Sequence, residues 1–553
     1  MLSWGRLALA SLLTLAASPS MAQPGPRSIG IKELDRWVAG IRDRNTKNPP
    51  EEVEPEDSDV QFEKGEEFGV DFLRSLQYWT HMRSYPNDSY DPTAYNRAVD
   101  SRERMAPASR RLLPPGLQGS AWEFVGPKNL NVPYRTYYGT RPTSGRVNNI
   151  AIDPTNGQRI FLATAGGGAW RTVDGGTNWV PVGNDWQMQN TQSVAIDPKN
   201  PNTVYVGTGD FNGFELYPFG LLRSTDGGDT WSSVGAGVFG DRIVTAVLID
   251  PNDSQSLFVA ASSRFGDGYV WKSTNGGASW SQAINVQSGW YNLKAGPADV
   301  NGKRAFYAIA NGNSPRIYVS KDQGVTWAPA TVPFGGDGYE GVDIAPSPVT
   351  VGTVYVLSGR EQSIYKSTDF GTTWTNITNN HPSGYNWSQS WYDWHLTVSH
   401  ANGKDVLYTG LIDLAMSTDG GTTWINAGRS YFGDARTHND QHGGTIDPSN
   451  PNRLIFGNDG GIYELVYNPA DGTTAIKGLS KTLGVTQFYD ADWHPTDADM
   501  MLGGTQDNAT PVSLSDLENW ENVGGGDGFQ VWINPIDPKI QYTTIYSNTL
   551  IKT

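Results

Sequence analysis

The sequence predicts an all-β protein built as a multi-bladed β-propeller. Three observations lead to this class: a short phrase recurs six times, its spacing is nearly constant, and the composition favours turns and aromatic anchors. The phrase is Ser/Thr-x-Asp-x-Gly-x-x-Trp, with Asn275 once in place of Asp, and its tryptophans lie 47 to 52 residues apart. A fixed period of this size is typical of repeat architectures. The six copies are 172–179, 224–231, 273–280, 320–327, 367–374 and 417–424.

Each copy of the phrase predicts a tight turn between two strands, and we call these six segments the box turns. An Asp side chain can accept a hydrogen bond from the backbone two residues further on, and Gly readily adopts a positive φ. The Trp that follows can anchor the turn to the core. The acidic residues of the box turns are therefore expected to be structural.

The segments between the box turns predict strands. Four strands in each period correspond to one propeller blade. The first strand of a blade is expected to end in an Asp-Pro-like turn, and about nine such starts are visible. They are 146–153, 191–197, 241–250, 288–296, 339–345, 391–399, 438–447, 487–494 and 529–535.

Three regions are expected along the chain. Residues 1–22 have a positive residue, an apolar run and the small-x-small end of a secretory signal peptide, which predicts a secreted or periplasmic protein. Residues 23–118 are expected to form a partly helical leader with an acidic linker. Residues 119–553 hold the blades. The last residues, 550–553, resemble the lead-in to a further box turn, so we expect the set of blades to be truncated.

The composition limits the possible partners. A chain of 553 residues is too long for one compact core unless it repeats. The net charge is −16 and no basic tract stands out, which argues against nucleic acid and anionic membranes as partners. No later segment is apolar enough to span a membrane. The chain has no Cys, which excludes disulfides and thiolate metal sites.

The segment His438-Asn439-Asp440-Gln441-His442 is the sharpest polar cluster. If it is extended, alternate residues share one face, so His438, Asp440 and His442 would converge. Two imidazoles and a carboxylate suit zinc or another divalent metal. Asp440 can equally orient one of these histidines as an acid/base pair. The alternative is a polar strand end that faces a water-filled channel, and no other cofactor is expected.

Residues 385–395 form a second candidate, rich in aromatic side chains. Trp391 and Trp394 can provide a platform on which sugar rings stack, and Asp393 and His395 can bind hydroxyl groups. The alternative is that these aromatic rings belong to the core between blades.

Carboxylates at the ends of second strands are a third candidate. Glycoside hydrolysis needs two carboxylates at a controlled separation. Asp459 and Asp507 are expected on successive blades at equivalent heights, and Asp210 and Asp527 occupy related places. Together with the polar cluster, this gives Asp440, Asp459, Asp507 and His442 as candidate catalytic residues. An Asp before Gly-Gly also makes a good turn, so a structural role stays open.

The spaced box turns resemble those of the Asp-box (BNR) repeat propellers. That superfamily includes sialidases, xyloglucan-active glycoside hydrolases and the sortilin-type receptor domain. The resemblance covers about residues 120–553 and implies that the box lies on an outer turn, away from the active centre. Further stretches look like secreted bacterial proteins labelled as glycosyl hydrolases with BNR repeats, or as sortilin-like. These stretches are Ser144–Val147 with Asp153-Pro154, Tyr205–Asp210, Gly457–Gly461 and Gly503–Asn508.

The chain also departs from these families. In xyloglucan-active members a catalytic Asp stands in an Ala-Arg-Thr-Asp-x-Gly-Gly-like phrase of the first blade, and here Ala165 occupies that place. The Phe/Tyr-Arg-Ile-Pro phrase of sialidases is absent before the first box turn. Two functions are therefore carried forward: a glycan-active protein that acts as a glycoside hydrolase on a polysaccharide, and a non-catalytic sortilin-like module that binds a peptide or a glycan.

Overall fold

The computed structural model describes residues 126–552 apart from 133–141, 185, 187, 212–217, 241, 263–267, 289–290, 312–315, 336–340, 379–386, 431–433, 498, 515–518, 525 and 546–548. The predicted signal peptide and leader lie outside these residues. Within the described part, the one helix is the short α5 (Ala236–Phe239). No helix there is long and apolar enough to cross a membrane.

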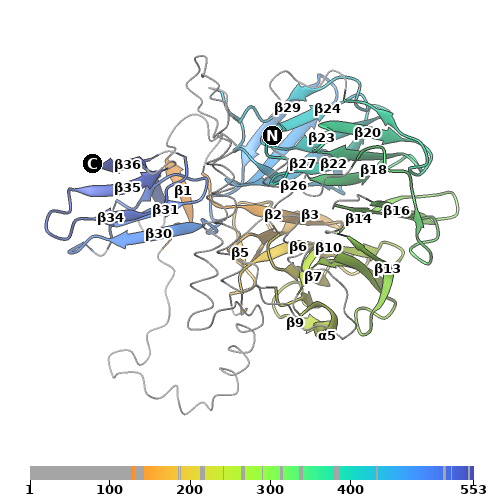
Figure 1. Ribbon diagram of the computed structural model, residues 1–553, viewed down its shortest axis with the longest axis horizontal. Coiled ribbons are helices and arrows are strands. Elements are labelled where there is room, and N and C mark those ends of the chain that lie inside the picture. Colours follow the sequence, from red (N-terminus) through yellow and green to blue (C-terminus); the bar gives the residue numbers. More distant parts are fainter. Residues whose placement is uncertain are drawn as a thin grey trace, which may run out of the picture. The chain divides into compact units, whose positions relative to one another are not determined.

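Seven antiparallel sheets of four strands each follow one another along the chain (Figure 1). Each sheet is one blade with its strands in sequence order, as the four-strand period predicts. The first strands are β2 (Val147–Asp153), β6 (Thr191–Ile196), β10 (Ile243–Asp250), β14 (Tyr291–Ala298), β18 (Val342–Pro346), β22 (His395–Ala401) and β26 (Gln441–Asp447). The second strands are β3 (Asn156–Thr164), β7 (Val204–Thr208), β11 (Asp253–Ser262), β15 (Arg304–Ala310), β19 (Val354–Ser358), β23 (Lys404–Gly410) and β27 (Asn450–Asn458).

The outer strands of the blades are shorter. The third strands are β4 (Ala169–Thr172), β8 (Leu221–Ser224), β12 (Gly268–Ser273), β16 (Arg316–Ser320), β20 (Ser363–Ser367), β24 (Leu414–Ser417) and β28 (Gly461–Asn468). The fourth strands are β5 (Val180–Pro181), β9 (Ser232–Val234), β13 (Ser281–Ser288), β17 (Ala328–Pro329), β21 (Thr375–Asn376), β25 (Ile425–Asn426) and β29 (Thr473–Gly478).

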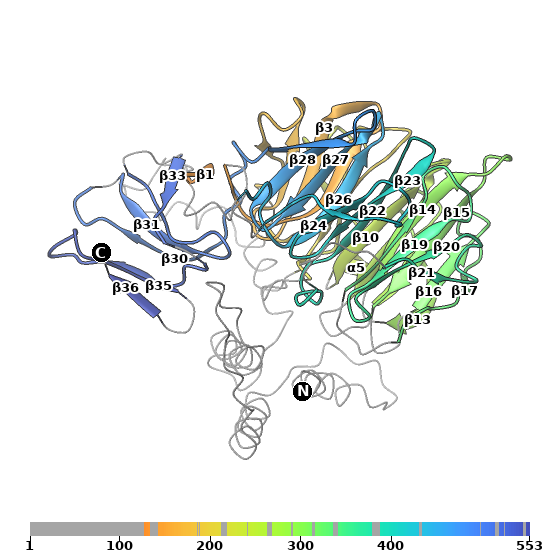
Figure 2. The same ribbon diagram turned by 90° about the horizontal axis from the view of Figure 1, so that it is seen from above.

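The first and seventh blades are neighbours, which closes the ring. β2 packs beside β26, and Val147 and Ile455 from these two blades share one core cluster. The Trp179 indole N–H donates to the Leu479 carbonyl at 2.8 Å. Closure leaves no blade of the ring with an unpaired side. Figure 2 shows the ring from a second direction, with β22 and β26 next to each other.

The core lies between the blades. Second strands such as β7 and β19 are buried along their whole length, because a neighbouring blade packs on each of their faces. Phe258 and Phe306 come from adjacent blades and meet edge to face, with ring centroids 5.5 Å apart. This packing fixes the first strands around the ring axis, where the polar side chains lie.

The box turns join third and fourth strands in six blades. In the first of them, the Thr172 hydroxyl donates to Asp174 at 2.7 Å and accepts from the Gly176 N–H at 3.1 Å. Asp174 accepts from the N–H of Asn178 at 2.9 Å. This donor lies four residues beyond the Asp, whereas the turn chemistry predicted two. The longer reach lets one carboxylate hold the whole turn, and Trp179 is buried as expected.

Two further sheets follow the ring. A five-stranded sheet has the order β1-β33-β32-β31-β30, and a three-stranded sheet has the order β34-β35-β36. Two of the nine expected first strands correspond to β30 and β34, which lie at an edge of these two sheets. Their strands are β1 (Asn129–Val132), β30 (Phe488–Trp493), β31 (Met501–Thr505), β32 (Pro511–Val512), β33 (Asn519–Asn522), β34 (Val531–Ile533), β35 (Gln541–Ile545) and β36 (Thr549–Lys552). The predicted all-β, multi-bladed propeller is confirmed, with seven blades in the closed ring.

Candidate active site

Three aspartates meet where the seventh blade adjoins the five-stranded sheet. Asp440 precedes β26, Asp459 follows β27 and Asp507 follows β31. One carboxylate oxygen of each lies within 4.8 Å of those of the other two. Asp440 and Asp459 are buried, and Asp507 is half-buried. We call these three residues the carboxylate cluster, and Asp507 is its most accessible member.

The local backbone directs two of these side chains. Asp440 has a φ of 64° and Asp507 a φ of 57°. Both values lie in the left-handed region, which Asp tolerates better than most residues. β26 therefore begins only at Gln441, and the extended alternation predicted for His438, Asp440 and His442 does not hold.

Asp459 is held on both of its carboxylate oxygens. The Tyr392 hydroxyl donates to one oxygen at 2.7 Å, and His442 Nε2 lies 2.8 Å from the other. Burial lowers the pKa of His442 well below its usual value, so the ring that faces Asp459 is neutral. Burial raises the pKa of Asp459 itself, while nearby Arg146 opposes that shift.

Arg146 is the buried cation beside the cluster. Its guanidinium donates to the Tyr392 hydroxyl at 2.7 Å and forms an ion pair with Asp210. Burial works against the charged form, but Asp210 and the other acidic neighbours raise the pKa of Arg146 overall. Gln506 also donates to the Tyr392 hydroxyl, at 3.1 Å. The Tyr392 hydroxyl therefore accepts hydrogen bonds from two side chains and donates one to Asp459.

Asp507 has acidic neighbours on two sides. One of its carboxylate oxygens lies within 4.8 Å of an oxygen of Asp459, and its backbone N–H donates to Asp527 at 2.5 Å. Burial raises the pKa of Asp507 well above its usual value, and the charge of Asp459 adds to this shift. The pKa of Asp527 is raised for the same two reasons, burial and the charge of Asp507.

Asp393 is a further buried carboxyl beside the cluster. It lies next to the carboxyl of Asp440. Asp440 also accepts from the Asn439 amide at 2.6 Å. Burial raises the pKa of both carboxyls well above the usual value, and the proximity of acidic groups adds to it. Asp393 is fully buried.

The two histidines of the proposed metal triad have other contacts. His438 is buried, with Nδ1 3.2 Å from the Asn439 carbonyl oxygen and Nε2 3.2 Å from that of Asp507. Burial lowers its pKa to about 4. His442 faces Asp459. Among the described residues, the structure gathers Asp440 with two other carboxylates rather than with two imidazoles.

The four residues predicted to bind a sugar do not form one exposed platform. Asp393 and His395 are buried. Trp394 packs against the cores of two neighbouring blades. Trp391 is half-buried next to Tyr392, with ring centroids 5.6 Å apart. The packing interpretation therefore describes Trp394 better than sugar stacking does, because its ring lies against other blades.

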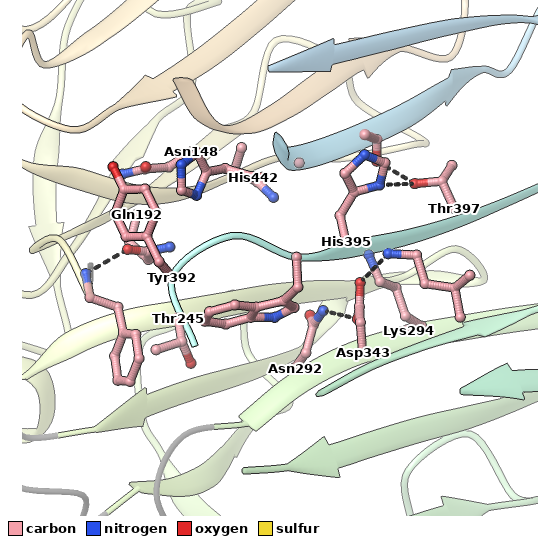
Figure 3. A pocket seen from close by; sticks show the side chains of 16 residues that line it. Asn148, Gln192, Thr245, Asn292, Lys294, Asp343, Tyr392, His395, Thr397 and His442 are labelled. Carbon is pink, nitrogen blue, oxygen red and sulfur yellow. Dashed lines mark hydrogen bonds between the residues drawn. The ribbon is translucent and has the colours of Figure 1, made fainter. Parts of the chain in front are cut away.

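A polar cavity of about 80 Å³ lies on the ring axis and is lined by residues from the first strands (Figure 3). Tyr392 and His442 line it and also hold Asp459, so the cavity wall is continuous with the cluster. His395 lies in the wall with Nδ1 3.4 Å from the Thr397 hydroxyl, and burial lowers its pKa to about 3. A cavity of this size and polarity suits a few water molecules.

Sequence reasoning missed the roles of Arg146 and Tyr392. Arg146 lies at the start of the first blade and Tyr392 is 246 residues away. Arg146 did carry a signal, since an Arg just before a buried strand that lines the axis needs an acidic partner. Tyr392 lies within the aromatic segment 385–395, and nothing in its local pattern distinguishes a hydroxyl that links charged groups from a stacking ring.

No protein-family model matches the chain. It does have relatives among characterised enzymes. A xyloglucanase from Paenibacillus sp. is 26% identical over 428 residues, which is 68% of this chain and 38% of that enzyme. Xyloglucanase Xgh74A from Acetivibrio thermocellus is 27% identical over 328 residues, covering 51% of this chain and 38% of the enzyme. The chain thus spans less than half the length of these relatives.

The fold comparison agrees with the sequence comparison. The GH74 xyloglucanase from Xanthomonas campestris superposes with a TM-score of 0.55 at 16% identity, covering 74% of this chain and 66% of that enzyme. At this sequence identity, the structural similarity establishes the propeller fold and nothing about activity.

Proposed function

We propose that the chain is part of a glycan-active hydrolase that cleaves xyloglucan or a related β-glucan. The observation that carries the proposal is the carboxylate cluster, in a propeller whose relatives are xyloglucanases. We also propose that the protein is exported, on the evidence of residues 1–22. Export would place it where polysaccharides occur.

Asp507 is the proposed proton donor. It is the half-buried member of the cluster, and burial and the charge of Asp459 raise its pKa, which favours the protonated carboxyl. Such a carboxylic acid can protonate the oxygen of a departing sugar. Tyr489 on β30 is exposed and lies near Asp507, and its ring stacks on the half-buried ring of Phe529, so this aromatic pair offers a face to a sugar ring.

Asp459 is proposed as a positioning residue. Paired catalytic carboxylates are about 5–5.5 Å apart in retaining enzymes and about 6.5–9.5 Å apart in inverting ones. One oxygen of Asp459 lies within 4.8 Å of one oxygen of Asp507, which is closer than either of these separations. Asp459, fixed by Tyr392 and His442, would hold the Asp507 carboxyl and its proton in place.

Hydrolysis is tested with the purified full-length protein and a panel of β-glucans, by measuring released reducing ends. We expect release from xyloglucan, and Asp507→Asn to lower kcat by a factor of about 10²–10⁴. Asp497→Asn is the matched control, because Asp497 is an exposed carboxylate in the turn between β30 and β31. A folded wild-type protein that releases no sugar from any glucan would refute the proposal.

A non-catalytic binding module is the second candidate, and one residue favours it. Ala165, which stands where the resemblance places a catalytic Asp, is fully buried and brings no carboxylate to the first blade. A module of this kind would bind xyloglucan or a peptide without turnover. Calorimetry with xyloglucan oligosaccharides separates the two: binding without release of reducing ends supports the module.

A further inference from the structure

We infer that the carboxylate cluster, together with Asp393, is a binding site for one hard divalent cation, with Ca²⁺ the best fit. The inference goes beyond the proposed hydrolysis and does not depend on it. It rests on the spacing of the oxygens, on buried carboxylate oxygens without hydrogen-bond donors, and on the oxygen-only character of the site.

The spacing fits a coordination sphere. One oxygen each from Asp440, Asp459 and Asp507 lies within 4.8 Å of the others. Ca²⁺ binds oxygen at about 2.3–2.6 Å, so ligands on opposite sides of the ion are about 4.6–5.2 Å apart and adjacent ligands are closer. Three carboxylates in this arrangement can contact one ion at once with little movement.

Buried oxygens without donors are the second, independent observation. Neither carboxylate oxygen of Asp393 has a hydrogen-bond partner among the described residues, and Asp440 Oδ1 has none either. Asp393 is fully buried and Asp440 is only 3% exposed. Since the carboxyls of these two residues face each other, their approach needs a proton or a cation between them. The box turns provide the contrast, because each Asp there has its own donors.

The surrounding groups select the kind of ion. Arg146, the buried cation nearby, is engaged by Asp210 and the Tyr392 hydroxyl. The nitrogens of His438 face carbonyl oxygens, and His442 Nε2 faces Asp459. The ligands that remain are oxygens, which favour Ca²⁺ or Mg²⁺ over zinc. The flexible coordination of Ca²⁺ suits an irregular set of aspartates better than the strict octahedron of Mg²⁺ does.

A bound cation and the proton of Asp507 would compete for the same carboxylate. An ion bound there would keep Asp507 ionised, whereas the proposed hydrolysis uses its protonated form. The binding experiment is therefore done without any glycan, so that its result is separate from the outcome of the hydrolysis assay.

The test is a calorimetric titration of the full-length protein with CaCl₂ after removal of metal by EGTA, repeated with MgCl₂. Terbium luminescence provides a second readout, because Tyr392 contacts Asp459 and can sensitise a bound ion. We expect one Ca²⁺ per chain, and a loss of affinity of at least about tenfold in Asp440→Asn and Asp393→Asn, since each removes a negative charge from the site.

Asp343→Asn is the matched control. Asp343 is also a buried carboxylate of the ring, but it accepts hydrogen bonds from Asn292, Leu396 and Ile344. We expect this variant to bind Ca²⁺ as the wild type does. The inference is overturned if folded wild-type protein binds neither ion at millimolar concentration, or if Asp440→Asn and Asp393→Asn bind as tightly as the wild type.

Discussion

The box turns and the carboxylate cluster use the same residue, aspartate, in opposite ways. In a box turn the carboxylate lies at the surface and receives donors from its own segment. Hydrogen bonds from Asn178, and then from Thr172, lower the pKa of Asp174 to about 2. In the cluster the carboxyls are brought together from distant segments, and burial and mutual repulsion raise their pKa values.

The difference shows which aspartates the fold requires for stability. A box-turn Asp completes a local network, and its charge is matched by donors within four residues. In the cluster, Asp440 Oδ1 has no hydrogen-bond partner among the described residues, and assembling the carboxyls costs free energy that the rest of the ring must offset. Side chains held at a cost to stability are those for which a chemical or binding role is the better explanation.

Arg146 gives the largest expected effect. Arg146→Met removes the buried cation and leaves Asp210 and Asp459 without compensation, so we expect the free energy of unfolding to fall by about 3–5 kcal/mol. Urea denaturation, followed by tryptophan fluorescence, measures this free energy of unfolding. Arg429→Met is the control, because the Arg429–Asp434 pair is exposed and contributes little. Equal losses in the two variants would mean that Arg146 does not compensate the cluster.

Asp440→Asn is expected to act in the opposite direction. In the presence of EGTA the amide removes one charge from a crowded site and provides an N–H donor for Asp393, so the free energy of unfolding should rise by about 1–3 kcal/mol. Thermal and urea denaturation of the two proteins under chelating conditions test this. A clear destabilisation would show that the ionised Asp440 carboxylate supports the fold.

The sequence was sufficient for the blades because their signals are local. A box turn is complete within eight residues, and the hydroxyl, carboxylate and glycine that close it all lie in that span. Nine first strands could therefore be placed. Closure of the ring at the seventh blade could not be predicted, because β30 and β34 carry the same sequence signature as the first strands of the ring. The parallel pairing of β1 with β33 joins segments about 390 residues apart and has no local signal.

The candidate site was predictable only in part. Asp459 and Asp507 stand out because each follows a buried second strand, and the structure places one carboxylate oxygen of each within 4.8 Å of the other. The alternation assumed for His438, Asp440 and His442 failed, because the positive φ of Asp440 ends the strand. The catalytic, sugar-binding and metal-binding roles of these residues stay predictions.

A box-turn aspartate gives a smaller expected effect. Asp322 accepts from Ser320, from the Thr326 N–H and from the Thr326 hydroxyl, at 2.7, 2.9 and 2.6 Å. Asp322→Ala removes these acceptors, and we expect a loss of about 1–2 kcal/mol in the free energy of unfolding. Asp322→Asn should be nearly neutral, because Asn275 in the third blade bonds the equivalent groups, with its amide donating to the Ser279 hydroxyl where Asp322 accepts from that of Thr326. If both variants lose stability equally, the charge matters and the acceptor geometry does not.

The pH dependence of the box turns is the smallest and most specific test. The pKa of Asp174 is lowered in the folded state from 3.8 to about 2. A group whose pKa is depressed on folding stabilises the fold above its unfolded pKa, and this contribution disappears as the pH falls through the folded value. The midpoint of urea unfolding should therefore decrease between about pH 4 and pH 2. Asp174→Asn cannot titrate, so the variant should show a shallower decrease over this range, and an unchanged slope would contradict the role of the local donors.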